Sequence, residues 1–319
     1  MTTPAREGRV VILGIFVADL TFRAPRMPQI GETIAGTSFL MGPGGKGSNQ
    51  AVAAARAGAD VVFCTRIGND AFGTIAQSTW TAEGITARAK VLDDVSTGAA
   101  HIFVDENTGM NAIIVASGAA GTMDASDVDA IDADIAAARV FVTQLEQPLE
   151  AARRGLEVAR KHGVTTVFNP APATPLDDAI FPLCDYITPN ETEAEILTGV
   201  KIANVDDARR AADVLLERGV GTAIVTLGEA GALFHTRGQS VHVPAFSCGK
   251  VVETAGAGDG FTGGFAAALA RGDEPLDAVR FGSALAGLSV TRAGTAPSMP
   301  MRDEIERVLQ QSPQASQRG

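Results

Sequence analysis

The chain has 319 residues, of which 45% are hydrophobic, and its formal net charge is −11. This length and hydrophobic content suit one large α/β domain, or one domain with a small appendage. The acidic balance and the lack of a Lys/Arg cluster argue against nucleic-acid and anionic-membrane binding, and no apolar run is long enough to cross a bilayer.

The N-terminal region and the cysteines indicate a cytoplasmic protein. The first apolar stretch begins at Val10 and is stopped by Asp19, which is typical of a buried strand and not of a secretory signal. Cys64, Cys184 and Cys248 are odd in number and scattered, so they predict neither a disulfide framework nor a zinc site. The four histidines are not clustered either.

Short β-branched runs alternate with alanine-rich stretches along the chain. The predicted strands are Val10–Leu13, Val61–Cys64, Val140–Thr143, Thr165–Asn169, Tyr186–Thr188 and Ala223–Leu227. The predicted helices include Ser48–Arg56, Leu149–Lys161, Val205–Glu217 and Gly263–Ala270. Strands without polar alternation are buried on both faces, so this order predicts a mostly parallel sheet with helices on both sides.

Two stretches break this rhythm, at about residues 20–41 and 97–115. They carry Thr, Gly and Pro with roughly alternating polarity, which favours β-hairpins that form a small lid sheet over the strand ends. Ordinary long surface loops remain the alternative. The whole pattern predicts one domain over residues 9–310 with the lid inserted in it, followed by a disordered tail at 311–319.

The segment Glu253–Gly260, with the sequence ETAGAGDG, precedes a helix of small residues. The N–H groups of Gly256, Ala257 and Gly258 would point outward at the helix N-terminus, where free N–H groups and the helix dipole favour an anion. Asp259 would lie beside that anion, where a carboxylate is repelled unless it accepts a proton from an attacking hydroxyl. The alternative is that Asp259 is the helix N-cap on a tight glycine turn.

A second glycine-rich segment, Gly42–Asn49, opens the predicted helix Ser48–Arg56. It is not a phosphate-binding Walker A loop, because Lys46 is followed by Gly47 and not by Ser or Thr. Glycines here would let the backbone approach a ligand, and Asn49 offers both a donor and an acceptor to hydroxyl groups. A helix-entry loop without a ligand is the alternative.

Carboxylates also follow three predicted strands. Asn190 and Glu193, in the sequence TPNETEAE, could hold a hydrated Mg²⁺ that carries ATP phosphates, or could form an acidic helix cap. Asp19 and Glu146 each follow a buried strand, and ligands of open α/β sheets gather at the carboxyl ends of strands. We therefore expect these groups near one crevice, with solvated strand-end carboxylates as the alternative.

Together these segments resemble the ribokinase-like (PfkB) carbohydrate kinases, and the ribokinases in particular. GGKGSNQAVAAARAGA is similar to the family's N-terminal signature and ETAGAGDGFTGGF to its C-terminal one, while QLEQPLE, FNPAPA, TPNETEAE, TLGEAG and VTRAGTAPSMP follow in the family's order. The resemblance runs from about Val10 to about Glu306. It implies a ribokinase-like three-layer αβα sandwich with a mostly parallel central sheet, and a small β-sheet lid that often mediates dimerisation.

The resemblance also implies roles for individual residues. Asp259 would be the catalytic base, with an anion hole formed by Gly256, Ala257 and Gly258. The sugar site would include the positions Val17, Asp19, Gly45, Lys46, Asn49, Glu146 and Asp259. ATP would contact Asn190, Thr226, Gly228, Gly231, Gly258 and Ser283, and Asn190 and Glu193 would organise Mg²⁺ through water. A K⁺ ion would be bound by Glu253, Ala255, Ser289, Arg292, Gly294 and Ser298, several of them through backbone carbonyls.

The implied activity is that of a cytoplasmic phosphotransferase with an alcohol acceptor. It would use ATP, Mg²⁺ and K⁺ to phosphorylate the primary hydroxyl of a pentose, first of all D-ribose, and would form a homodimer through the lid. Alternatives are a kinase for 2-deoxyribose, a ketohexose or a nucleoside, and a non-catalytic sugar or nucleotide sensor.

The chain departs from the ribokinase pattern at several of these positions. Val17 replaces an Asn, and valine cannot hydrogen-bond a sugar hydroxyl, so the substitution favours a deoxy sugar or is compensated by another contact. Glu253 replaces an Asp at the cation site, where the longer side chain would shift the cation or weaken its requirement. Gly260 replaces a Thr after the base, and Ser283 replaces a His near the adenine.

Overall fold

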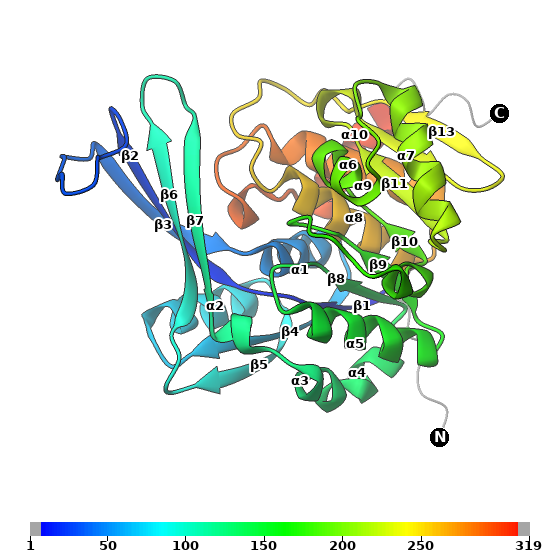
Figure 1. The fold of residues 1–319 in the computed structure, drawn as a ribbon, viewed down its shortest axis with the longest axis horizontal. Helices are drawn as coiled ribbons and strands as arrows, with labels where there is room; N and C mark the ends of the chain where they lie inside the picture. Colours follow the sequence, from blue (N-terminus) through cyan, green and yellow to red (C-terminus); the bar gives the residue numbers. More distant parts are fainter. Residues whose placement is uncertain (1–7, 312–319) are drawn as a thin grey trace.

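The computed structural model describes residues 8–311, which form a nine-stranded sheet and a separate four-stranded sheet (Figure 1). The order of the large sheet is β13-β12-β11-β10-β9-β8-β1-β4-β5. Its strands are β1 (Arg9–Leu13), β4 (Asp60–Gly68), β5 (Thr86–Leu92), β8 (Val140–Thr143), β9 (Thr165–Phe168), β10 (Tyr186–Ile187), β11 (Thr222–Thr226), β12 (Ala232–His235) and β13 (Ser240–Val243). The strands from β5 to β11 are parallel, and β12 and β13 are added antiparallel at one edge.

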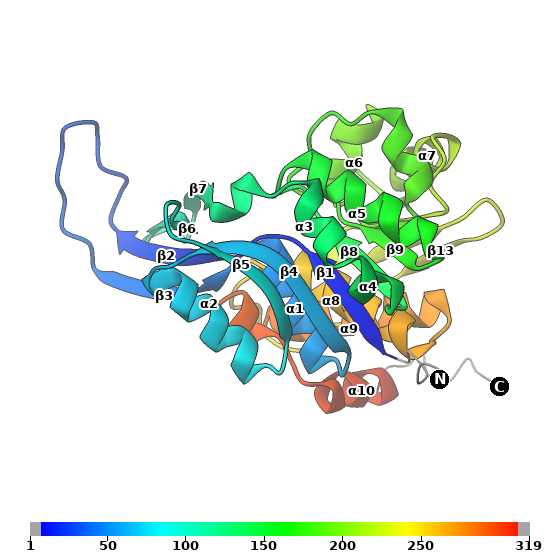
Figure 2. The same cartoon turned by 90° about the horizontal axis from the view of Figure 1, so that it is seen from below.

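Helices cover both faces of the large sheet, which confirms the predicted three-layer α/β fold (Figure 2). Successive residues of β1 point to opposite faces, so Val10 and Ile12 belong to one apolar core and Val11 and Leu13 to the other. The first core is closed by α1 (Lys46–Arg56), α2 (Ala71–Ala82), α8 (Ala257–Arg271), α9 (Pro275–Ser289) and α10 (Arg302–Gln311). The second is closed by α3 (Ala125–Ala130), α4 (Asp132–Ala136), α5 (Leu149–Lys161), α6 (Glu191–Thr198) and α7 (Val205–Glu217).

The four-stranded sheet, which we call the small sheet, projects from one side of this sandwich (Figure 1). Its order is β3-β2-β6-β7, formed by β2 (Val17–Ala24), β3 (Ser38–Gly44), β6 (Thr97–Asp105) and β7 (Asn111–Gly118). The two stretches that break the strand–helix rhythm thus form a sheet, with β2 and β6 paired in parallel. The strands extend beyond the predicted ranges, because β2 begins at Val17 and β7 ends at Gly118.

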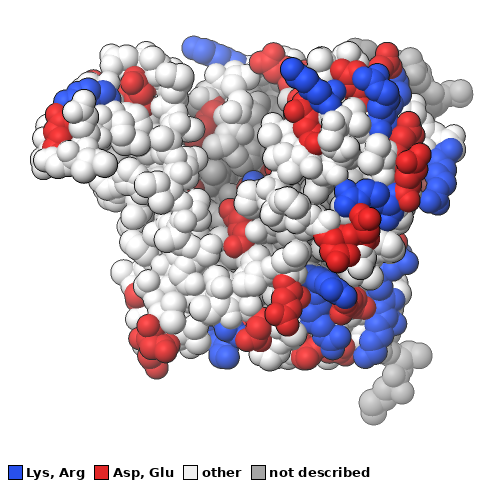
Figure 3. All heavy atoms as spheres, in the orientation of Figure 1, with Lys and Arg blue, Asp and Glu red and all other residues white. Residues whose placement is uncertain are grey.

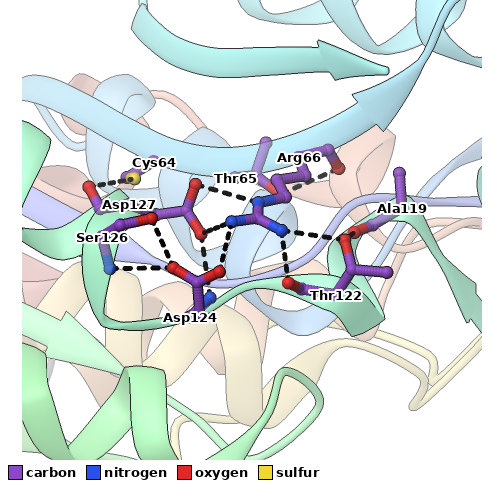
Figure 4. Close-up of polar contacts among 8 residues, drawn as sticks. All are labelled: Cys64, Thr65, Arg66, Ala119, Thr122, Asp124, Ser126 and Asp127. Carbon is purple, nitrogen blue, oxygen red and sulfur yellow. Dashed lines mark hydrogen bonds and ion pairs between the residues drawn. The ribbon is translucent and has the colours of Figure 1, made fainter. Parts of the chain in front are cut away.

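A buried ionic cluster anchors the segment after the small sheet to the large sheet (Figure 4). Arg66 of β4 donates from Nε to Oδ1 of Asp127 and from Nη2 to Oδ2 of Asp124, both at 2.9 Å, and also bonds Thr122. Asp124 and Asp127 form the capping box of α3. A buried guanidinium needs such a full set of acceptors, so the cluster fixes the path of the chain from β7 to α3.

The C-terminal part of the described chain is helical, since α10 runs to Gln311. The predicted tail at 311–319 otherwise lies outside the described residues. Within residues 8–311, no helix has both the length and the apolar character of a membrane span.

Candidate active site

The N-terminal halves of α1 and α8 pack closely beside the carboxyl ends of the central strands. Gly263 of α8 allows this approach, because a Cβ there would lie 2.5 Å from the carbonyl oxygen of Gln50 and 2.7 Å from Cβ of Ala53. The contact brings Asn49 and Gln50 to the first turn of α8, which carries Asp259.

Asp259 is buried, with 6% of its surface exposed, and both of its carboxylate oxygens accept hydrogen bonds from α1. Nδ2 of Asn49 donates to Oδ2 at 3.0 Å, and Nε2 of Gln50 makes a longer contact of 3.4 Å to Oδ1. The N-cap of α8 is Gly256, with no side-chain cap bond, so the alternative of Asp259 as an N-cap is wrong. Both carboxylate oxygens instead contact side chains of α1.

The predicted anion loop starts α8 with a left-handed residue, Gly256, at φ +78°. The N–H group of Ala257 donates to the carbonyl of Thr254 at 3.2 Å, so it is already bonded within the loop. Around Gly258 there is space, because, apart from its chain neighbours and the adjacent backbone of α8, no atom of residues 8–311 lies within 4 Å of the position that its Cβ would take. The helix N-terminus is therefore open to an anion at Gly258 and less so at Ala257.

Lys46 lies among carboxylates at the N-terminus of α1. Its backbone N–H donates to Oε2 of Glu146 at 2.7 Å, and the negative charge of Asp259 raises the pKa of its ammonium group. Burial raises the pKa of Glu146 to about 7, although Lys46 opposes this shift. Gly45 caps α1 at φ +88°, and a Cβ there would lie 2.6 Å from the carbonyl of Ile15.

Asp19 lies on β2, at the base of the small sheet. Burial raises its pKa to about 6, and the charges of Asp259 and Glu253 add to the shift. Its Oδ2 accepts from Oγ1 of Thr295 at 3.5 Å, and its carboxylate packs on Gly44, where a Cβ would be 2.1 Å from Oδ1. Val17, two residues earlier, is 2% exposed and belongs to the second apolar core.

Asn190 and Glu193 form a capping box at the start of α6. Oδ1 of Asn190 accepts from the N–H of Glu193 at 2.8 Å, and Oε2 of Glu193 accepts from the N–H of Asn190 at 2.9 Å. Burial raises the pKa of Glu193. The predicted acidic cap is therefore formed, and it occupies one oxygen of each side chain.

The residues predicted to contact ATP lie at the end of β11 and on α9. Thr226 forms a parallel bridge with Asn190, and Gly228, at φ +52°, faces open space apart from Glu191 at 3.8 Å. Gly231 has a role in the fold itself, because a Cβ there would lie 2.1 Å from the carbonyl of Val243. The hydroxyl of Ser283 is buried and has no hydrogen-bond partner within residues 8–311.

The predicted K⁺ ligands lie in two neighbouring segments. Oε2 of Glu253 accepts from the N–H of Gly294 at 2.8 Å, and the hydroxyls of Ser289 and Ser298 donate to nearby backbone carbonyls. Arg292 is paired with Glu304, which leaves its backbone carbonyl as the group that could meet a cation. No cluster of three His, Cys, Asp or Glu side chains suited to a metal is found in the described part of the chain. The predicted K⁺ ligands are hydroxyl and carbonyl oxygens together with the carboxylate of Glu253.

The structure thus brings Asp19, Glu146 and Lys46 close enough to Asp259 for their charges to interact, and Lys46 is the cation that acts on Glu146 and Asp259. Figure 3 shows a hollow between the small sheet and the body of the molecule, with acidic side chains along its walls. Such a site can bind a polyhydroxylated molecule through carboxylates and amides, and it offers a buried base beside an open helix N-terminus. Proton abstraction next to a bound phosphate is the chemistry that this arrangement supports.

Sequence reasoning missed several polar groups at the site. Gln50, Gln144 and Asn169 are buried and hydrogen-bonded in a chain that reaches Asp259. Thr295 links Asp19 to the carbonyl of Pro43 at 3.0 Å. All four lie in segments that carry the family resemblance, but nothing in their spacing indicated which side chains would meet.

Comparisons with known proteins identify the family of the chain. The family model described as pfkB family carbohydrate kinase matches residues 7–302. The chain is 40% identical to the ribokinase of Haemophilus influenzae, covering 94% of this chain and 98% of the relative, and 38% identical to the deoxyribokinase of Salmonella typhi with the same coverage. The structure of Arabidopsis thaliana ribokinase complexed with ribose and ATP is similar with a TM-score of 0.87 and 29% identity, covering 96% of this chain and 99% of that one. The chain belongs to the pfkB family of carbohydrate kinases.

Proposed function

We propose that this carbohydrate kinase transfers the γ-phosphoryl group of ATP to the primary hydroxyl of D-ribose, with Asp259 as the general base. One observation carries the proposal: a buried carboxylate in the first turn of α8, next to the open N-terminus at Gly258. A base within reach of a hydroxyl and beside a phosphate site is what in-line transfer requires. The ribokinase relative at 40% identity, and the similar structure that contains ribose and ATP, support ribose as the acceptor.

In this mechanism the sugar binds among Asp19, Asn49 and Glu146, and its primary hydroxyl points at Asp259. Asp259 takes the hydroxyl proton as the oxygen attacks the γ-phosphorus, and the bond to the β-phosphate oxygen breaks on the opposite side. The start of α8, which is open at Gly258, stabilises the negative charge that develops on the transferred group. Lys46 balances the carboxylates, which would otherwise repel one another in the buried site.

Asn190 and Glu193 would hold Mg²⁺ through water, because the capping box leaves one carboxylate oxygen of Glu193 for such a contact. When bound, Mg²⁺ neutralises charge on the phosphates. Glu253, Ala255, Ser289, Arg292, Gly294 and Ser298 would hold K⁺. The carbonyl and hydroxyl oxygens of these two segments are of the kind that hard cations prefer.

Val17 favours 2-deoxyribose as a second candidate substrate. Val17 offers no hydrogen-bonding group at the position where ribokinases have Asn, and a deoxyribokinase is 38% identical to the chain. 2-Deoxyribose is therefore the second candidate, ahead of a ketohexose or a nucleoside. A non-catalytic sensor would have no use for a buried base at this position.

The small sheet is proposed to act as a lid and as a dimer interface in the cytoplasm. Its strands expose many apolar side chains: Phe22, Phe39, Leu40, Met41, Ile113, Ile114 and Val115. Phe22, Phe39, Met41 and Ile114 lie on one face of this sheet, and Leu40, Ile113 and Val115 lie on the other. The charged side chains seen on this part of the molecule in Figure 3 gather at its tip, and exposed apolar patches mark protein interfaces. Closure over the sugar would exclude water, which is a competing phosphoryl acceptor.

A coupled ADP-release assay tests the proposal. Mg-ATP is supplied with ribose, 2-deoxyribose, fructose or a nucleoside, each with and without K⁺. We expect the highest kcat/KM on ribose and stimulation by K⁺. Preference for 2-deoxyribose would replace ribose and make Val17 the specificity determinant. ATP binding without turnover on any sugar would contradict the proposal and favour a sensor.

A further inference from the structure

A chain of buried side-chain amides runs from Asp259 into the protein interior. Nε2 of Gln50 contacts Oδ1 of Asp259 at 3.4 Å and donates to Oδ1 of Asn169 at 3.1 Å. Oε1 of Gln50 accepts from Nε2 of Gln144 at 2.5 Å. Gln50 and Gln144 have no exposed surface, and Asn169 is 6% exposed.

The donors and acceptors of this chain can be assigned in only one direction. The backbone carbonyl of Thr188 can only accept, and it lies 2.9 Å from the side-chain amide of Asn169, so that end of Asn169 must be Nδ2. Oδ1 of Asn169 therefore faces Gln50, which must present its NH₂ group to it. The same NH₂ group then presents its second hydrogen toward the carboxylate of Asp259.

The position of Oε1 of Gln50 assigns the amide of Gln144 in the same way. Its Oε1 faces Gln144, which must donate through Nε2, and this leaves Oε1 of Gln144 pressed against Gly14. A Cβ on Gly14 would lie 2.3 Å from that oxygen, so only glycine leaves room for the side chain. This oxygen has no hydrogen-bond partner among the residues that the structure describes, which is costly in a protein interior. In return, Nε2 of Gln144 holds the side-chain amide of Gln50 in one orientation.

We propose that Gln50 is a positioning residue for the general base, an inference that rests on the proposed role of Asp259. With Asn49 on Oδ2 and Gln50 on Oδ1, the carboxylate plane cannot rotate away from the acceptor hydroxyl. A side-chain amide suits this task, because it donates a hydrogen bond to a carboxylate oxygen and brings no charge of its own. The chain through Asn169 and Gln144 prevents Gln50 from flipping and turning an oxygen toward that carboxylate.

The test is a double-mutant cycle with Gln50→Met and Asp259→Ala. Methionine has nearly the size of glutamine but no N–H group, so Gln50→Met should lower kcat by about 10- to 100-fold, judged from hydrogen bonds to charged groups. The KM for the sugar should change by less than about threefold, because Gln50 does not line the proposed sugar site. In the Asp259→Ala background, which has no carboxylate to position, Gln50→Met should cause no further loss.

Gln147 supplies a matched control. It is buried like Gln50, and its Nε2 donates to Oγ1 of Thr143 and to the carbonyl of Gln144, but no bond links its side chain to Asp259. Gln147→Met should cost similar thermal stability and leave kcat within about threefold of wild type. If Gln50→Met does not fold, Gln144→Met tests the same chain, because loss of its donor leaves Gln50 held by Asn169 alone, which loosens the contact with Asp259 and lowers kcat only when Asp259 is present.

Two results would contradict the role of Gln50, and a third would contradict the role of Asp259. An unchanged kcat in folded Gln50→Met would overturn the inference while leaving Asp259 as the base. Multiplicative losses in the double mutant would also overturn it, because they indicate a structural effect unrelated to Asp259. If Asp259→Ala alone kept wild-type turnover, the proposed base itself would be wrong.

Discussion

Replacing Asp19 by Asn should stabilise the sugar-free protein and weaken its function. Asp19 is largely buried, and this burial raises its pKa from 3.8 to about 6. Above this pKa, the folded chain therefore carries the negative charge of Asp19 in a buried position that disfavours ionisation. Asparagine keeps the shape of the side chain and an oxygen for the hydroxyl of Thr295, but carries no charge.

The size and the pH range of the effect follow from the pKa values. Below pH 3.8 the carboxyl is protonated in the folded and the unfolded chain and does not distinguish them. As pH rises from 3.8 to about 6, the unfolded chain releases its proton first, so the folded state loses stability, and the loss is complete above pH 6. The full loss is about 3 kcal/mol, at about 1.4 kcal/mol per pKa unit.

Urea unfolding of the two proteins at pH 4 and at pH 8 measures this difference. Asp19→Asn should be more stable than wild type by about 0.5 kcal/mol at pH 4 and by about 3 kcal/mol at pH 8. The exposed carboxylate of Asp94 gives a control, and Asp94→Asn should change stability little at either pH. At pH 8 the stabilised Asp19→Asn should also show a lower kcat/KM for the sugar, since the proposed sugar contact is altered.

Two results would refute this reasoning. Equal stability of Asp19→Asn and wild type at pH 8 would mean that burial does not raise the pKa of Asp19. A difference in the free energy of unfolding that is equally large at pH 4 and pH 8 would mean that the effect comes from packing and not from the charge of Asp19.

Three further predictions follow from the packing of α8 and the small sheet. Gly263→Ala should lower the free energy of unfolding by about 1–3 kcal/mol in urea titrations, because its methyl group would press on the backbone of α1; unchanged stability would contradict the close approach of α1 and α8. Gly258→Ala should keep the thermal stability of wild type but raise the KM for ATP, since its methyl group would enter the space proposed for the phosphate; a normal KM would place the phosphate elsewhere. Met41→Asp with Ile114→Asp, two changes on one face of the small sheet, should convert the proposed dimer into a monomer in sedimentation experiments, whereas Lys90→Asp on β5 should not, and a dimer that survives both changes would exclude this face.

Much of the fold could be predicted because its signals are local. The strand Val10–Leu13 is apolar throughout, and such a run is stable only when both faces are buried. The antiparallel edge formed by β12 and β13 was missed, because each strand has only four residues and includes polar side chains. The helix α2 was missed as well, since its Thr, Ser and Gln residues weaken the helical pattern.

The candidate site also has one part that a local motif predicts and another part that depends on long-range packing. Asp259 and the start of α8 were predicted correctly as a carboxylate inside a glycine-led helix turn, because that motif is contiguous. The contact of Gln50 with Asn169 joins positions 119 residues apart, and its contact with Gln144 joins positions 94 apart. Those contacts depend on how α1 packs on the ends of β8 and β9, which no local pattern specifies.

The central claim is that Asp259 takes the proton of the sugar hydroxyl. Its most direct test is the kcat of Asp259→Asn with ribose and Mg-ATP, measured together with the dissociation constants of both substrates. We predict that kcat falls by about a hundredfold or more while both substrates still bind, because the amide cannot accept the proton. Near-normal turnover in a variant that folds and binds both substrates would contradict the account.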